Sequence, residues 1–342
     1  MKYIVVILFT ITVLGQNCNS PGKKENTVYQ KTGYLEKYDA ALDSIISAGA
    51  PAEIIAEGFD WSEGPLRVEQ HRMLLFSDIP TNIIYKWTEE KGKEIYLTPS
   101  GYTDTAKRSG ELGSNGLILD KDGYLVLCQH GDRRMARMDT PLDKPAPRFI
   151  TLADKYNGKR LNSPNDAVYN SAGELFFTDP PYGLETQSDN DPEKELPFNG
   201  VYKVKTNGEL VLLVDSITRP NGLAFLPGEK QLIIACSDPA KPNWYMYDVL
   251  GDSLVNGKVF YSAAAELSKG EIGLPDGLKI DKKGNVFATG PGGLFIFNSD
   301  GKLLGRLRLD NPASNCALSP DEKTIYITND MYVLRLKINP HP

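Results

Sequence analysis

Six short motifs place an acidic or amide side chain directly before an apolar run. Consecutive motif residues are separated by 52, 50, 56, 55 and 39 positions. Turns explain any one of these residues, because turns favour Asn, Asp and Gly. Six in a regular series indicate a shared position in a repeated structure. The motif residues are Glu63, Asn115, Asn165, Asn221, Asp276 and Asn315.

Gathered in one place, these side chains could hold a metal ion. Carboxylate and amide oxygens are the ligands that hard cations such as Ca²⁺ and Mg²⁺ take. Two carboxylates packed together away from water repel each other, and a cation between them offsets that repulsion. The set predicts one divalent cation, with Ca²⁺ favoured and Zn²⁺, Mg²⁺ or Mn²⁺ as alternatives.

The segments between the motifs predict the strands that must position these residues. Each unit continues with a turn and two further strands, and most units have a fourth. The second strands are the apolar runs LLFSD, LVLCQH, LFFTD, LIIACSD, VFATG and IYITND. A period of roughly 40–55 residues with short strands is typical of a β-propeller. We predict an all-β protein, a six-bladed β-propeller spanning residues 51–342.

The ring must also close. The last unit lacks a fourth strand, because only residues 339–342 follow its third strand. A strand-like run over residues 53–57 precedes the first unit at the distance that a fourth strand would have. We predict that this run completes the sixth blade.

This topology predicts where the chemistry lies. In antiparallel strands the start of one strand lies beside the end of the next. The six motif residues should therefore surround the axis at one end of the propeller. The residues that end the second strands are expected to join them in one cluster: Asp78, His130, Asp179, Asp238 and Asp330.

The N-terminus is typical of an exported protein. Residues 4–15 form an apolar run that is too short to span a membrane and resembles a signal-peptide core. We predict a signal peptide over residues 1–15, or alternatively 1–17 with lipidation of Cys18. The protein would then be periplasmic, or a lipoprotein anchored to the outer membrane. No later segment is long and apolar enough to cross a membrane.

Residues 16–50 are predicted to be a linker followed by a short helix. Within residues 34–48, the apolar side chains recur at helical steps, which predicts one amphipathic helix docked on the propeller. These side chains are Leu35, Tyr38, Leu42 and Ile45.

Composition and the absence of certain motifs argue against several other classes of protein. The 342 residues include 38 Lys and Arg against 44 Asp and Glu, a net charge of -6, which argues against a nucleic-acid binder. The four cysteines form no CxxC pair, so a zinc ribbon is disfavoured. The chain has no usable serine-hydrolase, NTPase or dinucleotide-binding motif.

The ordered motifs resemble those of a known family, the SMP-30/gluconolactonase/luciferin-regenerating-enzyme (LRE) family, and its exported bacterial members most closely. The resemblance covers residues 50 to 338. The matching stretches are AEGFDWSEGPL (56–66), LLFSDIP (74–80), LNSPNDAV (161–168), FFTDPPYG (176–183), RPNGLAF (219–225) and LPDGLKID (274–281).

The resemblance implies specific roles. The family holds a divalent cation on the axis with a Glu, an Asn and an Asp, which here are Glu63, Asn221 and Asp276. Its substrate-contacting Asn matches Asn165. In animal members an Arg shortly before that Asn contacts the substrate, and the nearest Arg in this chain is Arg160.

These parts imply hydrolysis of a sugar lactone to an aldonic acid. The cation would act as a Lewis acid on the carbonyl, and Asp276 would be the general base. His130 is either a second base, a hydrogen-bond donor or a structural residue. Tyr182 could stack on a sugar ring.

Other readings stay open. One is a broader lactone or organophosphate ester hydrolase on the same scaffold, and another is a non-catalytic propeller that binds sugar or protein. A quinone-dependent sugar dehydrogenase would need His and Arg side chains to converge on the axis, and only His130 is placed there.

Overall fold

The computed structural model describes residues 28–339. The predicted signal peptide and the alternative lipidation site at Cys18 lie outside the described residues. Within the described range, no helix is both long and apolar enough to span a membrane.

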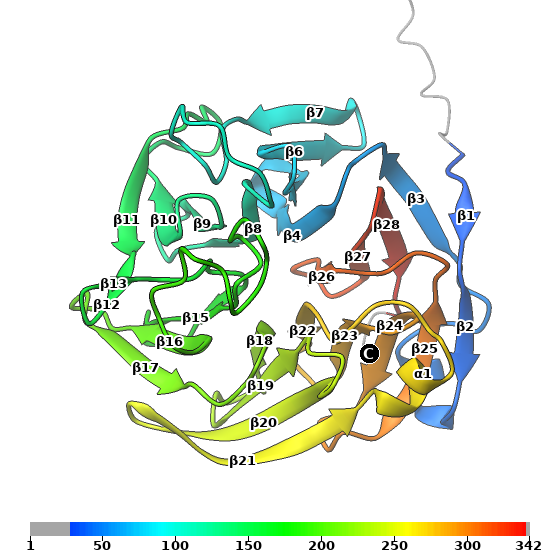
Figure 1. The fold of residues 1–342 in the computed structure, drawn as a ribbon. Helices are drawn as coiled ribbons and strands as arrows, with labels where there is room; N and C mark the ends of the chain where they lie inside the picture. The colour runs from blue at the N-terminus through cyan, green and yellow to red at the C-terminus, as the bar shows by residue number, and fades with distance from the viewer. Residues whose placement is uncertain (1–27, 340–342) are drawn as a thin grey trace, which may run out of the picture.

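Six antiparallel sheets surround a central axis, each made of four strands or more (Figure 1). The first two blades contain β4 (Ser62–Val68), β5 (Met73–Asp78), β6 (Ile83–Thr88) and β7 (Gly92–Leu97), then β8 (Ser114–Leu119), β9 (Leu125–Gln129), β10 (Arg134–Met138) and β11 (Phe149–Ala153). The next two contain β14 (Ala167–Tyr169), β15 (Leu175–Asp179), β16 (Gly200–Val204) and β17 (Leu210–Val214), then β18 (Pro220–Phe225), β19 (Gln231–Cys236), β20 (Asn243–Leu250) and β21 (Ser253–Ser262).

The last two blades each carry a fifth strand. The fifth blade contains β22 (Leu278–Ile280), β23 (Val286–Gly290), β24 (Gly293–Phe297), β25 (Leu303–Arg308) and β2 (Tyr34–Lys37). The sixth contains β26 (Asn315–Leu318), β27 (Thr324–Asn329), β28 (Tyr332–Lys337), β3 (Ala52–Glu57) and β1 (Lys31–Thr32). Smaller elements are the hairpin β12 (Lys155–Tyr156) and β13 (Lys159–Arg160), the helix α1 (Ala264–Ser268) and the 3₁₀ helices η1 (Ala40–Ser44) and η2 (Glu69–His71).

The ring closes as predicted. β3 pairs with β28, in a register that places Tyr332 opposite Glu57 and Arg335 opposite Glu53. The sixth blade is therefore built from both ends of the described chain. The prediction of an all-β, six-bladed propeller is confirmed.

The hydrophobic core lies between the blades. Six clusters of buried side chains each join two adjacent blades; for example, Phe76 and Trp87 of the first blade pack with Val333 of the sixth. A second strand such as β5 is buried at every position, since neighbouring blades cover both of its faces. This explains why the second strands read as continuous apolar runs rather than alternating ones.

Of the helix predicted over residues 34–48, the structure forms only the short 3₁₀ helix η1 (Ala40–Ser44). Residues 34–37 instead form β2, which pairs with the edge strand β25 and satisfies its backbone groups. The chain then turns through η1, whose N-cap is Asp39, because the side chain of this residue accepts the backbone N–H of Ala41 at 2.8 Å. Leu42 still reaches the core. The sequence therefore predicted that this side chain packs on the propeller, but not the backbone conformation of the segment.

Candidate active site

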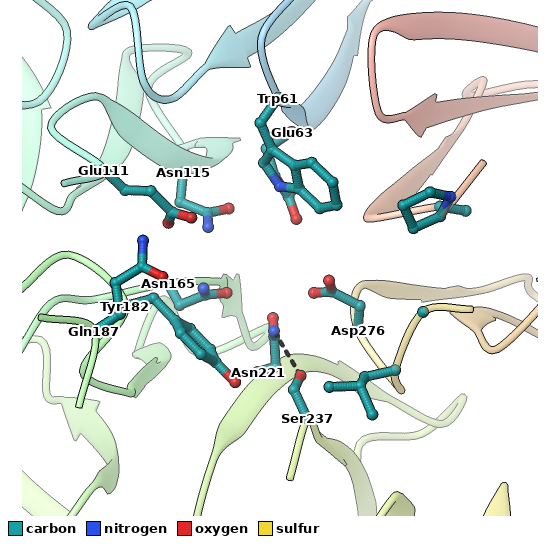
Figure 2. Close-up of a pocket in the computed structure, with 14 residues that line it drawn as sticks. Trp61, Glu63, Glu111, Asn115, Asn165, Tyr182, Gln187, Asn221, Ser237 and Asp276 are labelled. Atoms are coloured by element: carbon teal, nitrogen blue, oxygen red, sulfur yellow. Dashed lines mark hydrogen bonds between the residues drawn. The ribbon is translucent and has the colours of Figure 1, made fainter. Parts of the chain in front are cut away.

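A cavity of about 340 Å³ opens on the axis at one end of the propeller (Figure 2). Its wall comes from the start of the inner strands and from the loops around them. Five of the six motif residues line it: Glu63, Asn115, Asn165, Asn221 and Asp276. The remaining lining residues are Trp61, Glu111, Tyr182, Gln187, Ser237, Gly273, Leu274, Pro312 and Ala313.

Glycines allow the inner strands to converge around this cavity. A Cβ atom at Gly222 would lie 2.4 Å from the backbone oxygen of Asp276, and one at Gly277 would lie 2.0 Å from the side chain of Asn315. Any larger residue would therefore force adjacent blades apart. The Gly that follows Asn221 and the Gly that follows Asp276 are thus packing requirements that bring the polar side chains together.

Four side-chain oxygens in the cavity wall are buried without a hydrogen-bond partner among the described residues. They are the Oδ1 atoms of Asn115, Asn165, Asn221 and Asp276. Buried polar atoms are nearly always paired, since each unpaired one costs roughly 1–3 kcal/mol. Four unpaired oxygens in one wall indicate a binding partner that accepts their lone pairs.

Hydrogen bonds orient the amide of Asn221. Its Nδ2 donates to the Oγ of Ser237 at 2.8 Å, and that hydroxyl donates to the carbonyl oxygen of Pro275 at 2.6 Å. The amide nitrogen is thereby held away from the axis, which leaves Oδ1 directed into the cavity. Tyr182 lies beside Ser237, and burial together with the charge of Asp276 raises the pKa of its phenol.

Two of the three carboxyl groups in the cavity wall, those of Glu63 and Asp276, have strongly raised pKa values. Burial raises the pKa of Glu63 to about 8, although the backbone N–H of Gly64 donates to its Oε2 atom at 2.5 Å. Burial also raises the pKa of Asp276 well above its ordinary value, and the neighbouring charge of Glu63 adds to the effect. Both shifts follow mainly from burial, and the positive charge of Lys279 offsets the shift of Glu63 only in part.

The donor set fits a hard divalent cation. No group of three or more His, Cys, Asp or Glu that could hold a metal occurs in residues 28–339, so amide oxygens would have to complete the coordination. Glu63, Asn221 and Asp276 supply carboxylate and amide oxygens, the ligands that Ca²⁺ prefers. The unpaired Oδ1 atoms of Asn221 and Asp276 support this fit.

The acidic residues that end the second strands do not join this cluster, contrary to the expectation from topology. Asp78 Oδ1 accepts the backbone N–H groups of Asp60 and Trp61 at 3.1 and 3.0 Å. Asp179 accepts two backbone N–H groups in the same way in the third blade. These carboxylates cap the loops that lead into the inner strands, so they position the site without lining it.

Asn315 lies next to the cavity residues but outside the wall. Its Nδ2 donates to Glu63 Oε2 at 3.1 Å and contacts Asp166 Oδ2 at 3.5 Å. Asp166 is in turn 3.6 Å from the Nζ of Lys279. This buried network supports Glu63 from behind.

The other predicted site residues separate into two groups. Asn165 and Tyr182 line the cavity, whereas His130 and Arg160 do not. His130 is fully buried behind Glu111. Arg160 is exposed and lines a different hollow with Asp132, so the structure does not bring it to the axial cavity.

Three polar residues of the cavity wall were not predicted from the sequence: Glu111, Gln187 and Ser237. Glu111 and Gln187 lie in long loops with no repeated motif, and nothing in their sequence marks them. Ser237 directly follows β19 and precedes Asp238. Other units hold polar residues at the same place, namely Ser77, Gln129 and Thr178, and this place in the repeat was the available signal.

Comparison with known proteins agrees with this architecture. Residues 61–330 match the SMP-30/Gluconolactonase/LRE-like region. A gluconolactonase from Zymomonas mobilis is 37% identical over 98% of this chain and 94% of its own length. A solved gluconolactonase structure from Xanthomonas campestris is 27% identical with a TM-score of 0.76, covering 92% of this chain and 99% of that one.

A more distant structure shares the fold alone. Regucalcin from Agrobacterium tumefaciens, a calcium-binding protein, is 15% identical with a TM-score of 0.64 and covers 84% of this chain and 94% of its own. The family match spans most of the propeller, and the Zymomonas relative is similar over nearly the whole chain. This chain therefore belongs to the SMP-30/gluconolactonase/LRE-like family.

Proposed function

We propose that this protein hydrolyses a sugar lactone, such as an aldonolactone, to the corresponding aldonic acid. The observation that carries the proposal is the axial cavity, in which the carboxylate of Asp276 and three amides present unpaired oxygens beside a second buried carboxyl group, that of Glu63. The 37% identical gluconolactonase from Zymomonas mobilis supports the reaction class. Gluconolactone is accordingly the first substrate to test.

We further propose that the activity depends on one divalent cation, with Ca²⁺ favoured by the all-oxygen donor set. Glu63, Asn221 and Asp276 would hold it. When bound, such a cation supplies Lewis-acid polarisation of a carbonyl and stabilises negative charge on its oxygen.

The side chains of this protein account for the remaining steps. Asn165 and Tyr182 line the cavity and would orient the lactone ring, and Trp61 offers an aromatic face. Asp276 would accept a proton from the attacking water as the new C–O bond forms at the carbonyl carbon. When the ring C–O bond breaks, that proton passes to the leaving oxygen, which becomes a hydroxyl of the acid.

The direct test is proton release on a pH-stat. Wild-type protein would be given glucono-δ-lactone and other aldonolactones with Ca²⁺, Mg²⁺, Mn²⁺ or Zn²⁺, before and after chelation. We expect hydrolysis above the spontaneous rate, lost on chelation and restored by the native cation. Activity only on organophosphate esters would favour the broader hydrolase, and no activity would favour a binding role.

We also propose that the protein is exported, on the basis of the apolar run over residues 4–15. Mass spectrometry of the mature N-terminus would separate cleavage after residue 15 from lipidation of Cys18. An uncleaved N-terminus in the cytosolic fraction would contradict export.

A further inference from the structure

The cavity wall is polar on one side and, apart from Asp276, apolar on the other. Figure 2 shows Glu111 and Asn115 on the same side as Asn165 and Gln187, with Asp276 across the cavity from Glu111. Beside Asp276, the loops before the inner strands of the last two blades contribute residues without polar side chains: Gly273, Leu274, Pro312 and Ala313. A molecule that matches this wall has hydrogen-bonding groups along the side of Glu111 and carbon against these four residues.

Glu111 supplies the negative charge of the polar side. Its side chain is 24% exposed, and no Lys or Arg within the described residues forms an ion pair with it. Its loop is fixed, because the guanidinium of Arg108 donates to the backbone oxygens of Gly131 and Gly183. A carboxylate with free acceptor positions is therefore held at the edge of the cavity.

His130 stands directly behind Glu111. Its ring is completely buried, and its Nδ1 lies 3.4 Å from Oε2 of Glu111. Neither ring nitrogen forms a hydrogen bond with another described residue. The residue is also tightly confined, since a Cβ at Gly183 would lie 2.6 Å from the Cβ of His130. The carboxylate of Glu111 is thus a polar group that this imidazole faces.

We infer that Glu111 is a specificity-determining residue that accepts hydrogen bonds from the hydroxyl groups of a polyhydroxylated lactone, and that His130 is the positioning residue that holds its carboxylate. The inference rests on the proposed function, because it concerns the substrate of the same cavity. An ionised carboxylate is purely an acceptor, and hydroxyl groups are donors that match it. Hydrogen bonds to a charged acceptor are the stronger kind, so the contact would discriminate against rings that lack hydroxyls.

The first test measures binding of glucono-δ-lactam, a ring that keeps the hydroxyls but resists hydrolysis. By calorimetry, Glu111→Gln and Glu111→Ala should weaken binding about 10- to 100-fold, the loss of one charged hydrogen bond. The KM for glucono-δ-lactone should rise in parallel. The matched control Glu193→Gln removes an exposed carboxylate outside the cavity and should bind like wild type.

The same variants separate hydroxyl recognition from cation binding. Affinity for Ca²⁺ alone should stay within about threefold of wild type in Glu111→Gln, because the residues that fit the cation lie on other blades. A parallel loss of Ca²⁺ affinity would assign Glu111 to the cation instead and overturn the inference. Undiminished lactam binding in both Glu111 variants would overturn it as well.

His130 is tested by a pair of substitutions. His130→Phe removes the ring nitrogens, whereas Asn at this position can place a donor near the former Nδ1. We expect His130→Phe to raise KM more than it lowers kcat, and His130→Asn to recover most of the affinity. If His130→Phe does not fold, the Glu111 variants still decide the inference.

Failure of the inference differs from failure of the proposed function. Wild type that binds the lactam but hydrolyses no lactone contradicts the function and leaves recognition by Glu111 measurable. Wild type that hydrolyses glucono-δ-lactone, with Glu111 variants equal to it, contradicts the inference alone. Wild type that neither binds nor hydrolyses contradicts both.

Discussion

Ser237 holds the amide of Asn221 in the orientation that a cation would require. Without its hydroxyl, the amide could rotate and present nitrogen to the axis. Ser237→Ala should therefore lower Ca²⁺ affinity about 10- to 100-fold, as loss of a supporting partner does. Calorimetry would measure the change, with Ser268→Ala on α1 as a control remote from the cavity. Equal affinities in Ser237→Ala and wild type would show that Asn221 needs no such support.

Glu63 should make the stability of the cation-free protein depend on pH. Its pKa is about 8 in the folded protein, against an ordinary value of 4.5, because the carboxyl is buried. The folded state therefore holds this proton more tightly than the unfolded chain does. The free energy of unfolding should be highest near pH 5 in this range and fall as pH rises towards 8.

Thermal unfolding of chelated protein between pH 5 and 9 would measure this effect. Glu63→Gln cannot lose a proton, so its melting temperature should fall less over the range, while the exposed control Glu57→Gln should follow wild type. Ca²⁺ should remove most of the decline, because a cation favours the ionised form. Parallel profiles for wild type and Glu63→Gln would contradict the burial of an uncompensated carboxyl.

Motif spacing predicted the residues at the centre of the site but not those at its edge. Glu63, Asn165, Asn221 and Asp276 start or precede inner strands, and the repeat therefore places all of them on the axis. Glu111 reaches the cavity from an irregular loop, whose path depends on contacts such as those of Arg108. Local sequence does not encode such contacts, so the pairing of Glu111 with His130 became visible only in three dimensions.

Among the elements, strands buried on both faces were the most predictable. Once a repeat is recognised, an apolar run such as that of β5 can hardly be anything but a buried strand. The prediction of one helix from Tyr34 to Ile45 failed, because the apolar spacing of this segment fits both a helix and a strand followed by a tight turn. Residues 34–37 form a strand because they pair with the edge of β25, and tertiary pairing of this kind overrides local propensity.

The strand β3 is expected to be the element on which ring closure depends. Deleting residues 1–33 removes only the edge strand β1 from the described fold and should leave a cooperative thermal transition. Deleting residues 1–58 also removes β3 and Leu42 from the core, so it should unfold the ring or lower its melting temperature sharply. Circular dichroism during heating would compare the two truncations. Equal melting temperatures would contradict closure by β3.

For the whole molecule, the site exists only because six blades meet. The cavity residues come from all six blades or the loops before them, and no single blade holds two of the three residues that fit the cation. The axial site therefore forms only when the ring closes and the blades pack against one another. The sequence repeat predicted this arrangement because each unit must bury both faces against its neighbours.

In the function proposed above, the axial site hydrolyses lactones with Asp276 as the base. The most direct measurement is the kcat of Asp276→Asn on glucono-δ-lactone with Ca²⁺ present, beside wild type and the rim control Asp238→Asn. Asn keeps the size and one oxygen but accepts no proton, so kcat should fall about 10²- to 10⁴-fold while the fold and some Ca²⁺ binding remain. Asp238→Asn should stay close to wild type, since Asp238 lies outside the cavity and accepts from Thr218. Hydrolysis by Asp276→Asn within a few-fold of wild type would show that Asp276 is not the base.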